Sequence, residues 1–275
     1  MARLPDIILI GSPKAGTTTL CDVLAQHPDI YMLPGKEAHF FNDKYDQGID
    51  WYTSLFKDAP AGNMIAEGTP DYTEGARSKV TAERMAKHLP QAKLIYMVRE
   101  PIKRLESHYV QALHNGLPTI PLHEAVKSWP QLVQTSQYFA RLEDYLAHYP
   151  MSQIHILFYE DFITDPKAVV NDCLTFLGLP SKNDVEIRQL NSRDEKTQDS
   201  ALLGSARRWS GFKALRSLLP QALVDQVKPF FRRPVDPAAS LRWTPETRDF
   251  VEKSLSEDIP QFLEKAGRPS DFWAK

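Results

Sequence analysis

The sequence is poor in cysteine and has no long hydrophobic run. Its two cysteines, Cys21 and Cys173, lie far apart within apolar helical patterns and match no metal-binding spacing. They therefore predict buried free thiols in a reducing compartment rather than a disulfide. The N-terminal apolar run Ile7–Ile10 is too short for a signal peptide, and no later run approaches the roughly 18 residues of a membrane span. We expect a cytoplasmic protein without a membrane span.

The chain also lacks a large net charge. Its 275 residues include 33 Lys and Arg against 35 Asp and Glu, which leaves a formal charge of −2 at pH 7. No global field attracts nucleic acid or an acidic membrane, so we expect neither as a partner. Residues 188–233 nevertheless hold more basic than acidic side chains. Such a segment suits an anionic ligand and is equally typical of a solvated helical surface.

Short apolar segments alternate with helical patterns up to about residue 180. The apolar segments predict strands at Ile7–Ile10, Ile30–Leu33, Met64–Glu67, Leu94–Val98 and within Gln153–Asp161. The helical patterns begin at Thr17 and Pro101 and cover Ile49–Phe56, Lys79–His88, Gln137–His148 and Pro166–Leu177. Strands that are apolar throughout and alternate with helices indicate an α/β fold with a central parallel sheet flanked by helices.

The C-terminal third has a different pattern. After Pro180 the strand signal disappears, residues 181–240 are helical in patches, and Thr244–Ala266 is predicted to form one helix. We therefore expect a single domain over residues 1–275, with a nucleotide-binding α/β core at about 5–180 and a helical C-terminal cover at about 181–275.

The first strand–loop–helix has the glycine spacing of a phosphate-binding loop, with Gly11 and Gly16 separated by four residues. Such a loop turns backbone N–H groups inward, and the helix that follows adds its positive N-terminal end. In the usual triphosphate loop a Lys follows the second glycine. Here Thr17 holds that position and the only Lys of the loop is Lys14. On spacing alone, a strand–helix turn without a ligand is equally consistent.

The strand Leu94–Val98 ends in Arg99, where triphosphate enzymes commonly carry an Asp that holds Mg²⁺. An Arg is a poor metal ligand and a good phosphate ligand. Ser107 follows about two helical turns later and can offer a hydroxyl to the same anion. Taken alone, Arg99 is also consistent with a salt bridge at a strand end. Together with the loop, these residues predict a ligand with two anionic ends and no metal.

Several strings then resemble one family in order and spacing. "IILIGSPKAGTTTL" and "LIYMVREPIKRLESHY" resemble the two phosphate-binding segments of sulfotransferases that use 3′-phosphoadenosine 5′-phosphosulfate (PAPS). "KEAHFF", "EGTPDY", "LFYEDFITDP" and "FLGLP" are similar to the heparan sulfate branch of that family and its bacterial relatives. The resemblance implies a P-loop-type fold with PAPS as co-substrate and no metal. It implies a nucleotide site of Lys14, Ala15, Gly16, Thr17, Thr18, Thr19, Arg99 and Ser107.

The resemblance also implies catalytic roles. It places Lys14 at the leaving oxygen and makes Glu37 the base that takes the acceptor proton. Other sulfotransferases use a His, so His39 is the competing base; we favour Glu37, with His39 as a positioning or charge-stabilising group. Without the family resemblance, Lys36 and Glu37 are typical of an ordinary solvent-facing pair of charged residues.

The acceptor is less defined than the nucleotide. The heparan branch tends to carry Lys where this chain has Gly68, and its Lys-Gly-Arg loop beside a disulfide has no counterpart, the nearest basic pair being Arg207 and Arg208. We therefore expect a hydroxyl of a small molecule, glycan or lipid other than a sulfated polymer. The alternatives are a metal-dependent P-loop kinase or hydrolase and a catalytically inactive nucleotide-binding protein. The sequence does not determine the oligomeric state.

Overall fold

The computed structural model describes residues 3–115, 120–182, 184, 186, 197–199, 232–234 and 241–274. The chain divides into two compact units. The larger consists of Met1–Leu105, Pro130–Leu190 and Phe250–Lys275, and the smaller of Glu106–Trp129 and Asn191–Asp249.

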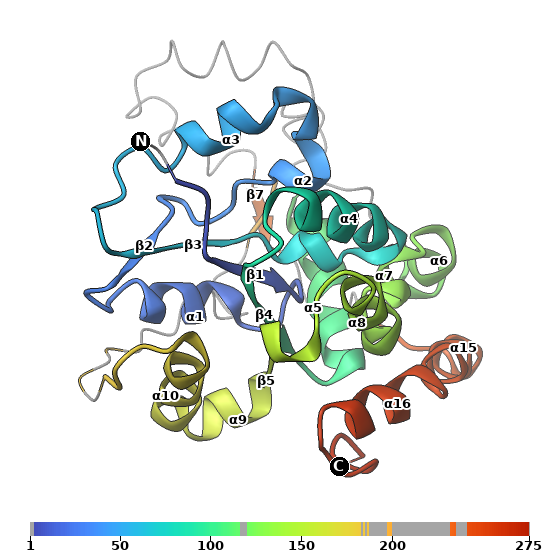
Figure 1. Cartoon of the computed structure of the whole chain (residues 1–275). Helices are drawn as coiled ribbons and strands as arrows, with labels where there is room; N and C mark the ends of the chain where they lie inside the picture. Colours follow the sequence, from blue (N-terminus) through green and yellow to red (C-terminus); the bar gives the residue numbers. More distant parts are fainter. Residues whose placement is uncertain are drawn as a thin grey trace. The chain divides into compact units, whose positions relative to one another are not determined.

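A five-stranded sheet forms the centre of the larger unit (Figure 1). Its strand order is β2-β3-β1-β4-β5, and every neighbouring pair is parallel. The strands are β1 (Ile7–Gly11), β2 (Ile30–Met32), β3 (Met64–Gly68), β4 (Lys93–Val98) and β5 (Ile154–Phe158). Because the strands are parallel, the loops after β1, β2, β3 and β4 all leave from the same edge of the sheet, where α/β proteins bind ligands.

Both faces of the sheet are covered, which explains why its strands are apolar throughout. In β1, Ile7 and Leu9 pack with one set of helices, while Ile8 and Ile10 pack with the other. The first set is α1 (Thr17–Leu24) and α10 (Pro166–Leu177). The second set is α4 (Ser78–His88), α8 (Tyr138–Leu146) and α16 (Asp258–Lys265). The predicted α/β fold with a flanked parallel sheet is confirmed.

Short helices complete the larger unit. They are α2 (Phe40–Asp43), α3 (Ile49–Ser54), α7 (Gln131–Gln134), α9 (Tyr159–Thr164) and the 3₁₀ turns Tyr45–Gln47, Pro70–Thr73, Gly75–Arg77 and Met151–Gln153. In the smaller unit, helix α6 covers Leu122–Ser128. Helices α5 (Pro101–His114) and α15 (Pro245–Leu255) each contain a boundary between the two units.

The C-terminal third departs from the prediction in two places. The single helix expected over Thr244–Ala266 is two helices, α15 and α16. In one continuous helix Pro260 would have no N–H to donate, and its ring would clash with the carbonyl of Ser256, four residues earlier. The expectation of no strand after Pro180 is also wrong. Strands β6 (Thr197–Asp199) and β7 (Arg232–Pro234) pair antiparallel, each too short to produce an alternating pattern.

Other sequence expectations concern single residues. Cys21 and Cys173 are free and buried, as predicted. None of the helices within the described ranges has the length and apolar character needed to cross a membrane. Most of the predicted helical cover at residues 181–240, including Arg207 and Arg208, lies outside the described residues.

Candidate active site

The loop between β1 and α1 is tied to the neighbouring strand. The Ser12 N–H donates to the carbonyl of Met97 in β4 at 2.5 Å, and the Ala15 N–H donates to the Ser12 carbonyl at 3.1 Å. Gly16, with φ of 92°, is the N-cap of α1, and no side chain of the described residues caps this helix end. The first N–H groups of a helix have no acceptor within it. Those of Thr17, Thr18 and Thr19 therefore remain for a ligand.

Tyr159 brings Arg99 and the phosphate loop together. A Cβ on Gly16 would lie 2.8 Å from Cδ2 of the Tyr159 ring, so the glycine permits this close approach. The guanidinium carbon of Arg99 lies 4.6 Å from the centroid of the same ring. Arg99 Nη1 also points at the Lys14 carbonyl at 3.5 Å. Tyr159 has little signal in the sequence beyond its place directly after an apolar strand.

The Nε atom of Arg99 is buried and has no hydrogen-bond partner among the described residues. A buried guanidinium N–H without an acceptor is costly, and an anion beside it would remove that cost. Arg99 therefore fits an anionic ligand at this edge of the sheet. Ser107 is buried in α5 and belongs to the smaller unit, whereas Arg99 belongs to the larger. Their shared role stays a prediction.

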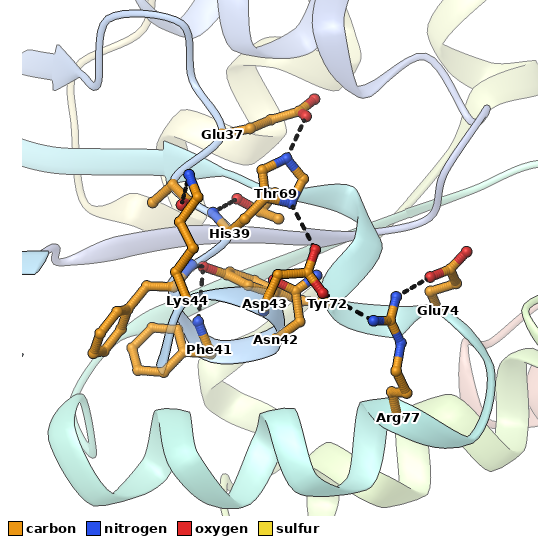
Figure 2. A network of polar contacts seen from close by, with 12 residues as sticks. Glu37, His39, Phe41, Asn42, Asp43, Lys44, Thr69, Tyr72, Glu74 and Arg77 are labelled. Carbon is orange, nitrogen blue, oxygen red and sulfur yellow. Dashed lines mark hydrogen bonds and ion pairs between the residues drawn. The ribbon is translucent and has the colours of Figure 1, made fainter. Parts of the chain in front are cut away.

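Glu37 and His39 lie on the loop that follows β2 (Figure 2). Glu37 Oε2 is 3.1 Å from His39 Nε2, and Glu37 Oε1 accepts a hydrogen bond from Lys36 Nζ. Lys36 and His39 both have positive φ, 56° and 54°. Side chains other than glycine rarely adopt this conformation, and such strain concentrates at functional sites. The structure thus brings together the two residues predicted as base and competitor.

The pair is part of a longer chain of charges. His39 Nδ1 lies 3.9 Å from Asp43 Oδ2, and Arg77 Nη1 donates to Asp43 Oδ1 at 2.9 Å. Figure 2 shows the chain continuing from Arg77 to Glu74. Acidic and basic side chains therefore alternate from Glu37 to Glu74.

These contacts set the protonation states. Burial favours a raised pKa for Glu37, but the hydrogen bonds from His39 and Lys36 and their positive charges outweigh it and lower the pKa to about 2. The hydrogen bond to Glu37 raises the pKa of His39, against the effect of burial. Burial, helped by the charge of Glu74, raises the pKa of Asp71 to about 6. At neutral pH, Glu37 is therefore ionised.

Within the described ranges, no three His, Cys, Asp or Glu side chains gather as a metal site. The expectation that the reaction needs no metal stays a prediction.

Comparisons with known proteins identify the family of the chain. The family model of the sulfotransferase domain matches residues 4–233 of the chain. This chain belongs to the sulfotransferase domain family. The match includes the phosphate loop, the Glu37–His39 loop and Arg99, so the family resemblance seen in the sequence is confirmed.

The curated sulfotransferase relatives are enzymes named for heparan sulfate. The chain is 35% identical over 190 residues to heparan sulfate glucosamine 3-O-sulfotransferase 3B1 of Homo sapiens, a match that covers 64% of this chain and 47% of that protein. It is 31% identical over 242 residues to heparan sulfate glucosamine 3-O-sulfotransferase 6 of Homo sapiens, covering 84% of this chain and 69% of the relative. The chain thus spans about half the length of several of these relatives.

Two solved sulfotransferases share the fold. A sulfotransferase from Alicyclobacillus acidocaldarius superposes with a TM-score of 0.70 at 22% identity, over 99% of this chain and 100% of the other. The mouse sulfotransferase SULT7A1, crystallised with PAP, has a TM-score of 0.50 at 19% identity, over 96% of this chain and 90% of the other. These likenesses show the architecture that the family members share.

Three further side chains lie at this sulfotransferase-family site. Phe40 and Phe41 are fully buried in the core. Glu67, at the end of β3, is also fully buried and accepts four hydrogen bonds. Glu67 opens the string "EGTPDY", which predicted no role for it. An acidic residue inside an apolar strand was the sequence feature that could have indicated a buried polar site.

Proposed function

We propose that this chain transfers the sulfuryl group of PAPS to a hydroxyl of an acceptor. The observation that carries the proposal is the ionised Glu37, held beside His39, on the same sheet edge as the phosphate loop and Arg99. Membership of the sulfotransferase family supports the transfer, and the PAP bound to the mouse relative supports the donor. We also propose one sulfotransferase domain over residues 1–275, since the family match extends across sequence from both units.

The nucleotide is held at two phosphates in this proposal. The free N–H groups at the start of α1 and the hydroxyls of Thr17, Thr18 and Thr19 bind the 5′-phosphate, aided by the N–H groups of Ala15 and Gly16 and by the helix N-terminus. Arg99 and Ser107 bind the 3′-phosphate. The unpartnered Nε of Arg99 supports its part, because a charge-assisted hydrogen bond to phosphate would satisfy it.

The transfer is an in-line displacement. The acceptor oxygen forms a bond to sulfur while the bond from sulfur to the bridging oxygen of the 5′-phosphate breaks, and PAP leaves. Lys14 neutralises the negative charge that grows on that bridging oxygen. Positioning and electrostatics supply most of the acceleration, as in phosphoryl transfer.

Glu37 takes the proton of the acceptor hydroxyl. With a pKa of about 2 it is ionised at every physiological pH but is a weak base. Proton transfer therefore follows the formation of the sulfur–oxygen bond, which makes the acceptor proton more acidic. His39 donates to Glu37 Oε2 and orients it. The His39 Nε2 keeps its proton in the hydrogen bond to the ionised Glu37 and cannot take another, which favours Glu37 for the role.

The acceptor hydroxyl belongs to a small molecule, glycan or lipid. The names of the relatives describe transfer to a sugar hydroxyl of heparan sulfate, which supports an alcohol as nucleophile. At Gly68, a Cβ would lie 2.5 Å from Cys21 Sγ, so a larger side chain would displace the helix residue behind it. Position 68 therefore cannot supply a cation to a sulfated polymer, which supports a different acceptor for this chain.

Calorimetric titration with PAP and with Mg-ATP tests the proposal. PAP is expected to bind in excess chelator, because both of its phosphates have partners in the protein. Incubation with labelled PAPS and a panel of phenols, sugars and hydroxylated lipids then identifies the acceptor. Tight binding of ATP with a strict requirement for Mg²⁺ would instead support a kinase or hydrolase. PAP binding without transfer to any acceptor class would support an inactive nucleotide-binding protein.

A further inference from the structure

Glu67 lies at the centre of a buried hydrogen-bond network below the Glu37–His39 loop. Its Oε1 accepts from the hydroxyls of Tyr52 and Tyr72, each at 2.8 Å. Its Oε2 accepts from the Ala38 N–H at 3.1 Å and from the Thr69 hydroxyl at 2.9 Å. A carboxylate can accept about four hydrogen bonds, so all of its capacity is used.

Two of these hydroxyls connect the Glu67 carboxyl group to backbone N–H groups of the loop through hydrogen bonds. The His39 N–H donates to the Thr69 hydroxyl at 3.3 Å, and the Phe40 N–H donates to the Tyr72 hydroxyl at 3.1 Å (Figure 2 shows Thr69 and Tyr72 beside the loop). Because each hydroxyl accepts from the loop, its own proton points to Glu67. The Ala38 N–H and the Thr69 and Tyr72 hydroxyls thus all donate to Glu67. Burial raises the pKa of this carboxyl, and the hydrogen bonds that it accepts act in the opposite direction.

We propose that Glu67 is a positioning residue that holds three consecutive loop N–H groups, those of Ala38, His39 and Phe40. It binds the first directly and the other two through Thr69 and Tyr72. The inference rests on the proposed roles of Glu37 and His39, which this network keeps in register with each other.

The loop needs such a support because His39 has a left-handed backbone, which its side chain disfavours. A relaxed backbone at His39 would move its ring relative to Glu37, to which its Nε2 is bonded. Three anchored N–H groups in a row leave the backbone little freedom to relax. A buried carboxyl group that binds neighbouring backbone groups is a rigid support, since moving it would leave donors unpaired in an apolar core.

Tyr52 provides a matched control for Tyr72. Both side chains are fully buried and both donate to Glu67 Oε1 at 2.8 Å. Only the Tyr72 hydroxyl also accepts from loop N–H groups. Tyr52→Phe therefore removes one hydrogen bond to Glu67 and none to the loop. Tyr72→Phe removes a hydrogen bond to Glu67 and also the acceptor of the Phe40 N–H. Thr69→Val removes the second relay with little change in shape.

The measurement is the pKa of His39, obtained by following its imidazole NMR signals as the pH is changed. These signals are assigned by their absence from the spectrum of His39→Asn. The carboxylates that face His39 are Glu37, Asp43 and Asp71, and all three are kept in every variant. We expect Tyr72→Phe and Thr69→Val to lower the pKa of His39 toward the ordinary value of about 6.5, because its bond to Glu37 weakens. Tyr52→Phe should leave that pKa at its wild-type value and lower the melting temperature less than Tyr72→Phe, which also leaves the Phe40 N–H without its acceptor.

PAP affinity, measured on the same samples by calorimetry, separates this inference from the proposed function. It should stay within about twofold of wild type in all three variants, since none of them contacts the phosphate loop. If Tyr52→Phe shifts the His39 pKa as much as Tyr72→Phe, or if neither relay variant shifts it, Glu67 is only a structural residue and the inference is overturned. If the protein does not bind PAP, the proposed function fails while the His39 titration still decides the role of Glu67.

Discussion

At the scale of single residues, Arg99 and Glu37 are placed by different means. Arg99 follows the buried strand β4, and the Tyr159 ring supports its guanidinium. Glu37 sits on a strained loop whose own side chains set its charge. Substitutions at Arg99 should therefore affect binding, and those at Glu37 the chemical step.

Arg99→Ala should weaken PAP binding by about 2–4 kcal/mol, the range for losing a charge-assisted partner of a desolvated anion. Binding of 5′-AMP, which lacks the 3′-phosphate, should weaken far less. Calorimetry with both nucleotides on wild type and variant measures the difference. Equal losses for both nucleotides would place Arg99 away from the 3′-phosphate.

Glu37→Gln should lower turnover by roughly 10² or more, because the amide keeps the shape of the side chain but cannot accept a proton. PAP affinity should stay within about 1 kcal/mol of wild type, since Glu37 is not a phosphate ligand. Single-turnover transfer from labelled PAPS to the identified acceptor measures the step. His39→Asn should do less damage. If His39→Asn abolished turnover while Glu37→Gln kept a near-normal turnover, His39 would be the base.

Asp71→Asn should stabilise the protein at pH 7.5 by up to about 3 kcal/mol, from a folded pKa of about 6 against an ordinary 3.8. Because the folded state holds the proton more tightly, wild-type stability falls as the pH rises from about 4 to about 6. The advantage of the variant should therefore shrink as the pH is lowered through that range. Urea unfolding at several pH values measures it, with the exposed Asp58→Asn as the control. A difference in the free energy of unfolding between Asp71→Asn and wild type that does not change with pH would contradict the raised pKa of Asp71.

At the scale of elements, the site depends on loops that leave one edge of the sheet. The phosphate loop follows β1, the Glu37–His39 loop follows β2, and the Glu67–Tyr72 segment ends β3. Close approach at these strand ends requires glycine. Gly16 meets Tyr159 in helix α9, so a helix distant in sequence limits the shape of the phosphate loop.

Gly16→Ala should lower both stability and PAP affinity. Its φ of 92° strains any side chain, and its new Cβ would lie 2.8 Å from the Tyr159 ring. Gly62 is a matched control, since its φ is 94° and a Cβ there meets nothing within 4 Å. Gly62→Ala should cost about 1–2 kcal/mol of stability, the strain alone, with PAP affinity unchanged. Equal behaviour of the two variants in urea unfolding and calorimetry would show that the Tyr159 contact is unimportant.

At the scale of the larger unit, residues near the C-terminus pack beside the junction of β5 and α9, where Tyr159 lies. Trp273 packs within the core cluster of the sheet, and its Nε1 donates to Glu160 Oε2 at 3.1 Å. Glu160 Oε1 in turn accepts from the Glu100 N–H at 2.9 Å, next to Arg99. Arg268 pairs with Asp161 and stacks on Phe158. The C-terminal residues therefore support the start of α9 and the backbone next to Arg99.

Trp273→Ala should lower the free energy of unfolding by about 2 kcal/mol, less than for a fully buried ring because Trp273 is half-buried. Trp273→Phe keeps an aromatic ring and loses the hydrogen bond to Glu160, so it should cost only about 1 kcal/mol. Urea unfolding of both variants measures the two contributions. Losses of equal size would mean that the hydrogen bond, rather than packing, holds the chain end.

Periodicity within short segments determined much of this protein. The five strands, the helices that flank them and the buried cysteines follow from local apolar patterns, because each reflects a face that neighbouring residues must bury. The motif order also pointed to the family and to Lys14, Arg99 and Glu37. Pro260 marks a limit: the local apolar pattern predicted one helix, whereas the chain forms two, and the proline lies in the first turn of the second.

Only the tertiary structure decided how the site is held. Glu67 meets Ala38 because β2 and β3 are neighbours in the sheet. Tyr159 lies close to Gly16 because α9 follows β5, which is separated from β1 only by β4. Strand order brings these residues together, and no local pattern records it. The depressed pKa of Glu37 likewise requires the left-handed turns that bring Lys36 and His39 onto one carboxylate. Backbone propensity acts between chain neighbours, whereas burial, charge and close packing act between whichever residues the fold makes adjacent.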